Sequence, residues 1–452
     1  MEYAVRIILI IFAVVGITFF IKSKDRYRFI ISDTFWVIVP WTLCLFMYYF
    51  SGIDYPIKLE WYMLLYIVLF WLCYFLGKNI VQKILTKKYG ENKKRNTITI
   101  KKEQPKFNFL PLFFVSLVAV IIYVVYFLAI NNIVLGQTRN FNANAFTTFL
   151  LIISSSSLII WLYELSYALL YDKKISWYAF ISAIIFNVPG LITSGRDALI
   201  IFIIATFITL IYCGNLSVKV LKKKGHTYSK TKKVLCLAMG VVLFYLIFLT
   251  SNRYGHSAIK QFMWASGCSF PPYLEFIYYN LGGLGKLILN TVFYYSSQFS
   301  KLALVFDHYS GPYLGGLYQL HYVSRLLPES WGLNYTLVNE GVIRAVEEVS
   351  IVGMKPLWDT MIGYFIFDFG KILAPVMSFF LGVVVGFAKY LIKLNKSIFN
   401  IIVYVLIALG AFISVQFSPF FDYYYIFPFA VLVAIMIYIK YEERKKQVKK
   451  QR

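Results

Sequence analysis

Charged side chains are scarce in this sequence. They make up 15% of the 452 residues, and only 21 residues are acidic. Soluble globular chains carry about 25% charged residues, because charge keeps a folded surface in water. Hydrophobic residues account for 60% of the chain, and the mean hydropathy is +0.67. These values exclude a soluble domain of any class, and we predict a polytopic membrane protein.

Cysteine and histidine are also rare. The chain has five cysteines and four histidines, and none of them forms a C-x-x-C pair or a His/Cys spacing typical of a metal site. Four of the cysteines lie in or beside apolar runs, and only Cys268 falls in a long stretch outside such runs. We therefore expect no disulfide pair and no metal site.

Long apolar runs dominate the chain. A membrane-spanning helix needs about 20 largely apolar residues, and these runs are too long for strands and show no two-residue alternation. The runs are 4–21, 29–50, 59–76, 109–129, 146–170, 176–193, 198–213, 234–251, 373–391, 398–415 and 423–439. The first lacks a basic start and a small-residue cleavage site, so we expect a span and not a signal peptide. The predicted fold is all-α, with about eleven transmembrane helices.

The net charge of +24 is concentrated in loops. With Lys389, six segments hold 33 of the 45 basic residues: 22–28, 77–108, 171–175, 214–233, 392–397 and 440–452. These segments alternate along the chain as the loops of one membrane face do. Basic loops stay in the cytoplasm, so we predict an outer N-terminus and a cytoplasmic C-terminus. We interpret the positive charge of these loops as a signal that sets the membrane topology, and it also favours binding to anionic lipid headgroups. We therefore expect no nucleic-acid partner.

One long segment, 252–357, separates the eighth and ninth predicted spans and faces outward. It contains turn signals such as Pro271-Pro272 and apolar-aromatic stretches such as Leu287–Phe306, so we predict amphipathic helices against the membrane surface. Three parts follow: an N-terminal membrane bundle of about eight spans (1–251), the outer loop (252–357), and a C-terminal bundle of about three spans with a basic tail (358–452). Long non-spanning segments in compact proteins are usually functional.

Arginine is enriched on the predicted outer face. Six of the 34 lysines face outward, but six of the 11 arginines do so. A guanidinium fork matches phosphate in a bidentate way and stays ionised when desolvated, so this enrichment predicts an anionic ligand such as a lipid-linked phosphate or pyrophosphate. The outward arginines are Arg6, Arg139, Arg196, Arg253, Arg325 and Arg344. The alternative is ordinary salt bridging to Glu340, Glu347 and Glu348.

Two of these arginines lie at tight exits from predicted spans. Ser194-Gly195-Arg196-Asp197 connects two spans with no room for a loop, and ionisable groups at membrane depth are costly and usually functional. Arg196 can alternatively pair with Asp197 or snorkel. Arg253 lies where the eighth span ends, and a snorkelling anchor is its alternative.

Several outward residues can act as acids or bases: Glu275, His321, Glu340, Glu347, Glu348 and Asp359. Their spacing selects none of them, and each can instead be a structural or solvated residue. Glu164 lies inside the fifth predicted span, where we interpret it as a hydrogen-bonding partner between helices.

The layout resembles the Wzy-type oligosaccharide repeat-unit polymerases, which include O-antigen, capsule and enterobacterial common antigen polymerases. The resemblance rests on the short Gly195-Arg196-Asp197 connection, the Arg253-Tyr254-Gly255 exit and the large outer loop. Two further landmarks are similar to segments before the last spans of such polymerases. They are Gly315-Gly316-Leu317 with Tyr322-Val323-Ser324-Arg325-Leu326-Leu327-Pro328, and Met361-Ile362-Gly363-Tyr364 with Phe367-Asp368-Phe369-Gly370.

The resemblance implies a reaction. The growing glycan on undecaprenyl pyrophosphate would move as a block onto a new lipid-linked repeat unit at the outer face of a bacterial inner membrane. It implies no cofactor and no metal, and a possible chain-length-regulating co-polymerase as a partner beside membrane lipids. The catalytic candidates are then Glu275, His321 and Glu347, and the substrate-binding candidates are Arg196, Arg253, Tyr254, Arg325 and Arg344.

Two alternatives remain open. An O-antigen ligase, or another transferase of lipid-linked glycan, would use the same arginines with a different acceptor. A transporter or lipid-linked oligosaccharide flippase would show polar residues along several spans, symmetric halves and short loops on both sides. The clean spans and the single outer loop of about a hundred residues favour chemistry at the outer surface.

Overall fold

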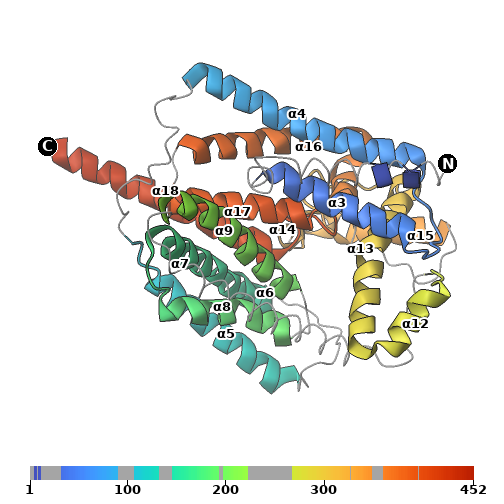
Figure 1. Ribbon diagram of the computed structural model, residues 1–452, viewed down its shortest axis with the longest axis horizontal. Helices are drawn as coiled ribbons and strands as arrows, with labels where there is room; N and C mark the ends of the chain where they lie inside the picture. Colours follow the sequence, from blue (N-terminus) through green and yellow to red (C-terminus); the bar gives the residue numbers. More distant parts are fainter. Residues whose placement is uncertain are drawn as a thin grey trace. The chain divides into compact units, whose positions relative to one another are not determined.

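The fold is all-helical in the part of the chain that the computed structural model describes (Figure 1). That part comprises residues 5–7, 9–11, 32–89, 106–131, 145–192, 197–221, 267–325, 327–348, 360–394 and 397–451. Within these ranges every regular element is a helix, and an isolated antiparallel β-bridge joins Asp54 to Ser269. The predicted all-α fold is confirmed for these residues.

Five helices of the described ranges are long and apolar enough to cross a membrane. They contain Trp61–Lys88, Leu110–Phe127, Phe146–Tyr171, Met361–Ile392 and Tyr423–Glu442. Four shorter apolar helices, Thr34–Phe50, Trp177–Ile192, Asp197–Cys213 and Ile398–Ile413, also coincide with predicted spans. The chain is therefore a helical membrane protein. The predicted span 234–251 and most of 4–21 lie outside the described residues, so the number eleven stays a prediction.

The chain forms two compact units whose segments alternate in the sequence. Unit 1 comprises Met1–Tyr89, Val241–Phe387 and Gly410–Phe421, and unit 2 comprises Gly90–Gly240, Ala388–Leu409 and Asp422–Arg452. Within unit 1 the described elements are α3 (Asp33–Phe50), α4 (Trp61–Tyr89), α12 (Pro272–Asn280), α13 (Gly282–His308), α14 (His321–Ser324), the short 3-10 helix η2 (Glu329–Trp331), α15 (Thr336–Glu348) and most of α16 (Met361–Leu394).

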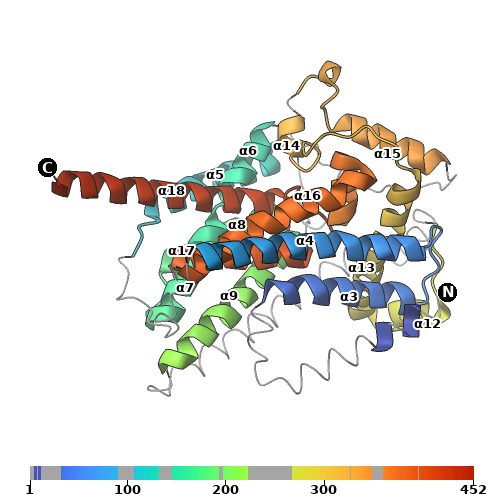
Figure 2. The same ribbon diagram turned by 90° about the horizontal axis from the view of Figure 1, so that it is seen from above.

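Helices α4 and α16 run side by side in both Figure 1 and Figure 2. Glycines allow their backbones to approach closely. A Cβ atom at Gly77 would meet the carbonyl of Phe379, and one at Gly382 would meet the carbonyl of Tyr74. Small residues at such crossings are the usual solution for helices in lipid, where no hydrophobic force draws helices together.

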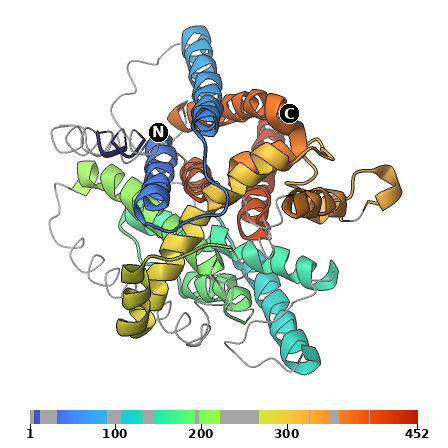
Figure 3. The same cartoon turned by 90° about the vertical axis from the view of Figure 1, so that its right-hand side faces the viewer.

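Helix α13, part of the predicted outer loop, is a 27-residue helix that packs against α3 (yellow and dark blue in Figure 3). The Phe299 ring lies edge-on to the rings of Trp41 and Tyr48, with centroids 5.9 and 5.8 Å away. The Ser300 hydroxyl donates a hydrogen bond to the carbonyl of Ile57 at 2.8 Å. A helix does form over the predicted stretch Leu287–Phe306, and its buried face is part of the core of unit 1. Its position against the membrane surface stays a prediction.

Helix α16 begins at Met361, whereas the sequence places the start of this span at residue 373. The helix kinks at Gly370, whose φ of 73° and ψ of 171° are not helical. A tyrosine ring, that of Tyr313, lies 3.4 Å from where a Cβ of Gly370 would be. The predicted start at residue 373 falls just after this break, and the helical turns from Met361 to Phe369 were not predicted because Asp368 interrupts the apolar run. This aspartate is buried and accepts backbone hydrogen bonds.

Unit 2 is built from α5 (Leu110–Asn131), α6 (Ala145–Ser155), α7 (Ser157–Tyr171), α8 (Trp177–Ile192), α9 (Asp197–Leu221), most of α17 (Ile398–Ile413) and α18 (Tyr423–Gln451). Tyr123, Phe127 and Leu150 belong to its buried core cluster. The predicted span 146–170 is two helices that meet at Ser156. Serine hydroxyls in this run bond back to the preceding turn, as Ser155 does to the carbonyl of Ile152 at 2.8 Å, and such bonds bend helices.

Candidate functional site

A buried carboxylate of α16 holds the segment that precedes α14. Asp368 is 1% exposed, and its carboxylate accepts the backbone N–H groups of Tyr318 at 2.9 Å and Gln319 at 3.2 Å. Its own carbonyl accepts the N–H of Gly315 at 2.8 Å. The side-chain carbonyl of Gln319 accepts the hydroxyl of Ser418 at 2.5 Å. The segment 315–319 is thereby fixed on the first half of α16.

The one-turn helix α14 then presents two of the predicted site residues. The N–H of Arg325 donates to the carbonyl of His321 at 2.9 Å, so the two side chains are one helical turn apart. Residues four apart on a helix share a face. Ser324, between them, is fully buried and anchors the turn. The local fold therefore places an imidazole next to a guanidinium.

The imidazole of His321 is held by stacking. Its ring lies 4.0 Å from the ring of Phe421 at an angle of 27°, and Nδ1 is buried without a hydrogen-bond partner among the described residues. Burial, and secondarily the charge of Arg325, lower the pKa of His321 from 6.5 to about 4. A neutral imidazole at pH 7 with an unpaired ring nitrogen can accept a proton.

Arg325 is exposed and cationic, and it packs on an aromatic ring. Its guanidinium lies 4.9 Å from the ring centroid of Tyr335, and Nη2 donates to the Tyr335 hydroxyl at 3.2 Å. No carboxylate of the described residues lies within ion-pair distance of Arg325 or Arg344, and Glu348 instead pairs with His308 at 3.6 Å. Among the described residues, the salt-bridge alternative is therefore not observed for these two arginines.

The other predicted site residues are not gathered here. Glu275 lies in the first turn of α12, where a carboxylate complements the helix dipole, and Glu347 and Arg344 lie on α15. The described contacts link none of these three to His321 or Arg325. Arg196, Arg253 and Tyr254 lie outside the described residues. The structure thus brings together two of the predicted residues, His321 and Arg325.

The lowered pKa of His321 predicts a pH dependence of stability. Between pH 6.5 and 4 the unfolded chain binds a proton that the folded chain does not, so stability falls as the pH drops through this window. At pH 5 the loss is about 2 kcal/mol. Melting curves of the detergent-solubilised protein at pH 7.5 and 5 should show a larger drop for the native chain than for His321→Gln. Equal drops in the native chain and in His321→Gln would contradict the lowered pKa of His321.

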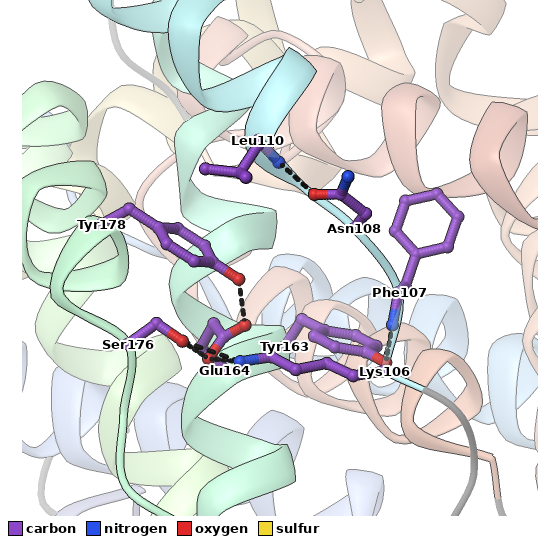
Figure 4. Close-up of polar contacts among 8 residues, drawn as sticks. All are labelled: Lys106, Phe107, Asn108, Leu110, Tyr163, Glu164, Ser176 and Tyr178. Carbon is purple, nitrogen blue, oxygen red and sulfur yellow. Dashed lines mark hydrogen bonds and ion pairs between the residues drawn. The ribbon is translucent and has the colours of Figure 1, made fainter.

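A second polar cluster lies in unit 2, around Glu164 of α7 (Figure 4). This carboxylate is 1% exposed and pairs with the ammonium of Lys106 at 2.9 Å. It also accepts the hydroxyls of Ser176 at 2.7 Å and Tyr178 at 2.5 Å. The Tyr163 hydroxyl accepts the N–H of Phe107 at 3.0 Å. The cluster ties the segment before α5, the middle of α7 and the start of α8 together, and we assign it a structural role.

Removing the carboxylate of this cluster should be destabilising. In Glu164→Ala the partly exposed ammonium of Lys106 can turn to solvent, but the hydroxyls of Ser176 and Tyr178 lose their acceptor, at a cost of about 1–3 kcal/mol. The melting temperature in detergent is the measurement. Glu442→Ala, at a half-exposed carboxylate of α18, is the control and should melt like the native chain. An unchanged melting temperature for Glu164→Ala would show that the pair contributes nothing.

Three residues around His321 and Arg325 were not predicted as site residues from the sequence: Asp368, Gln319 and Ser418. A single aspartate inside an apolar run was the available signal, because a charge at membrane depth needs a partner. No family model, curated protein or solved structure matches this chain. What the fold and the site define is a helical membrane protein in which a neutral histidine lies one helical turn from an arginine without an acidic partner among the described residues.

Proposed function

We propose that this chain is a membrane glycosyltransferase that polymerises oligosaccharide repeat units carried on undecaprenyl pyrophosphate. The observation that supports the proposal most is the pairing of His321 with Arg325 on one turn of helix. A proton acceptor near a guanidinium that pairs with no acid of the described residues suits transfer from a pyrophosphate carrier. The proposal includes a bacterial inner-membrane location, with this site on the outer face.

In the proposed reaction a hydroxyl of the acceptor repeat unit attacks the anomeric carbon of the lipid-linked glycan. The new glycosidic bond forms as the bond from that carbon to the pyrophosphate oxygen breaks, and His321 takes the hydroxyl proton. Arg325 neutralises the charge that develops on the leaving pyrophosphate. Burial is the main reason that the pKa of His321 is low, and the Arg325 charge is the smaller one; a bound anion offsets the Arg325 charge and so raises this pKa.

Reconstitution tests this function against its two alternatives. The purified protein is placed in liposomes with lipid-linked repeat units, and the glycans are separated by size. A ladder of repeat units supports the polymerase. Transfer only when a separate lipid acceptor is added would mean a ligase, and movement of the units between leaflets without any new bond would mean a flippase.

A further inference from the structure

A small cavity lies where α3 ends and α4 begins in unit 1. It has a volume of about 200 Å³, and none of the residues of the His321–Arg325 site lines it. Its floor contains Tyr48, Tyr49 and Tyr55, each at most 8% exposed. The rings of Tyr48 and Tyr55 are stacked with centroids 5.0 Å apart. The base of the cavity is therefore aromatic.

The walls of the cavity are held in place by hydrogen bonds. The Tyr48 hydroxyl accepts the N–H of Leu59 at 2.9 Å, and the Tyr55 hydroxyl bonds with Ser296 at 2.5 Å. The backbone of Asp54 pairs with Ser269 in both directions, at 2.9 and 3.0 Å. A site whose walls are ordered before the ligand arrives loses little entropy on binding.

The rim of the cavity is polar and slightly acidic. Lys58 pairs with Asp54 at 3.4 Å, and Glu60 adds a second carboxylate. The rim carries two carboxylates and one ammonium, so its charge is net negative and disfavours binding of a phosphate. Carboxylates instead accept hydroxyl donors strongly. Trp61 is 51% exposed at the same rim and adds another aromatic face.

We propose that this cavity binds one sugar ring of the glycan. A sugar ring has an apolar C–H face that suits aromatic side chains and a hydroxyl edge that suits carboxylates. The volume is below the ~300 Å³ at which pockets for larger ligands begin, so one ring fits better than an oligosaccharide. The identity of the sugar as part of a repeat unit rests on the proposed function, and the predicted topology places the cavity on the same outer face.

Saturation-transfer NMR on the purified full-length protein tests the inference. The probes are methyl glycosides of a neutral hexose and of an N-acetylhexosamine, with glycerol phosphate as a stand-in for a lipid headgroup. We expect transfer to at least one glycoside, reduced about fivefold or more in Trp61→Ala and in the conservative Glu60→Gln. Asp172→Asn is the control, because Asp172 is exposed and has a left-handed conformation that asparagine tolerates.

Three outcomes would overturn the inference: no transfer to either glycoside, glycoside transfer unchanged by both substitutions, or variant-sensitive transfer to glycerol phosphate alone. Its failure is distinguishable from failure of the proposed function. Sugar binding at this cavity without a polymer ladder in liposomes would contradict the proposed polymerase function but support the sugar site. A polymer ladder without sugar binding at this cavity would support the polymerase function and contradict the sugar site.

Discussion

Replacing Arg325 with alanine is expected to lower polymer formation in liposomes by about 10²-fold. The side chain contacts the Tyr335 ring and no carboxylate of the described residues, so its removal leaves no buried acid unpaired. Its positive charge is what the proposed reaction needs for the leaving pyrophosphate, and loss of one such donor costs about 10²–10³-fold in other enzymes. Arg325→Lys should recover part of the activity, because lysine keeps the positive charge but cannot make the bidentate contact of a guanidinium.

The matched control for this variant is Arg444→Ala. Arg444 is exposed near the end of α18, in a segment that the sequence assigns to the cytoplasmic side. Its removal should leave the ladder unchanged. Native activity in Arg325→Ala would eliminate this arginine from the reaction, and equal losses in both variants would indicate a general effect of positive charge.

Replacing Asp368 with alanine is expected to abolish the polymer and destabilise the protein. The backbone N–H groups of Tyr318 and Gln319 would lose their buried acceptor, at about 1–3 kcal/mol each. The segment that leads into α14 would then no longer hold His321 in place. Asp368→Asn should be milder, because the amide oxygen still accepts one of the two bonds. The ladder and the melting temperature are both measured.

Asp307→Asn serves as the control for the loss of an aspartate in the same unit. Among the described residues, Asp307 accepts only the exposed hydroxyl of Tyr62, at 3.0 and 3.1 Å. Asp307→Asn should therefore leave both the ladder and the melting temperature near native. A fully active and stable Asp368→Ala protein would show that the contacts of Asp368 do not position the site.

Much of the fold could be predicted from apolar runs alone. Long runs fix where helices form, because the bilayer leaves the backbone few other ways to satisfy its hydrogen bonds. The start of α16 at Met361 could not be predicted this way, since the sequence does not show that Asp368 finds its partners on a segment some 50 residues earlier. Glu164 shows the opposite case: its role between helices was correctly interpreted from its position inside a span.

The site was predicted in part. His321 and Arg325 are four residues apart, so the sequence already allowed them to meet on a helical turn, yet it offered Glu275 and Glu347 as equal candidates. His321 differs from these two glutamates because its ring is stacked on Phe421, a residue about a hundred positions away, and its Nδ1 is buried. Such contacts depend on tertiary structure and leave no local pattern. The predictions for Arg196, Arg253 and Tyr254 remain predictions.

The most direct test of the central claim is deletion of the gene in its own strain, followed by gel separation of surface and lipid-linked glycans. A polymerase predicts surface glycan that carries a single repeat unit and no ladder. The native gene should restore the ladder, and the Arg325→Ala gene should not. Full-length polymer stranded on the lipid carrier, or unpolymerised units held on the cytoplasmic side, would contradict the proposal.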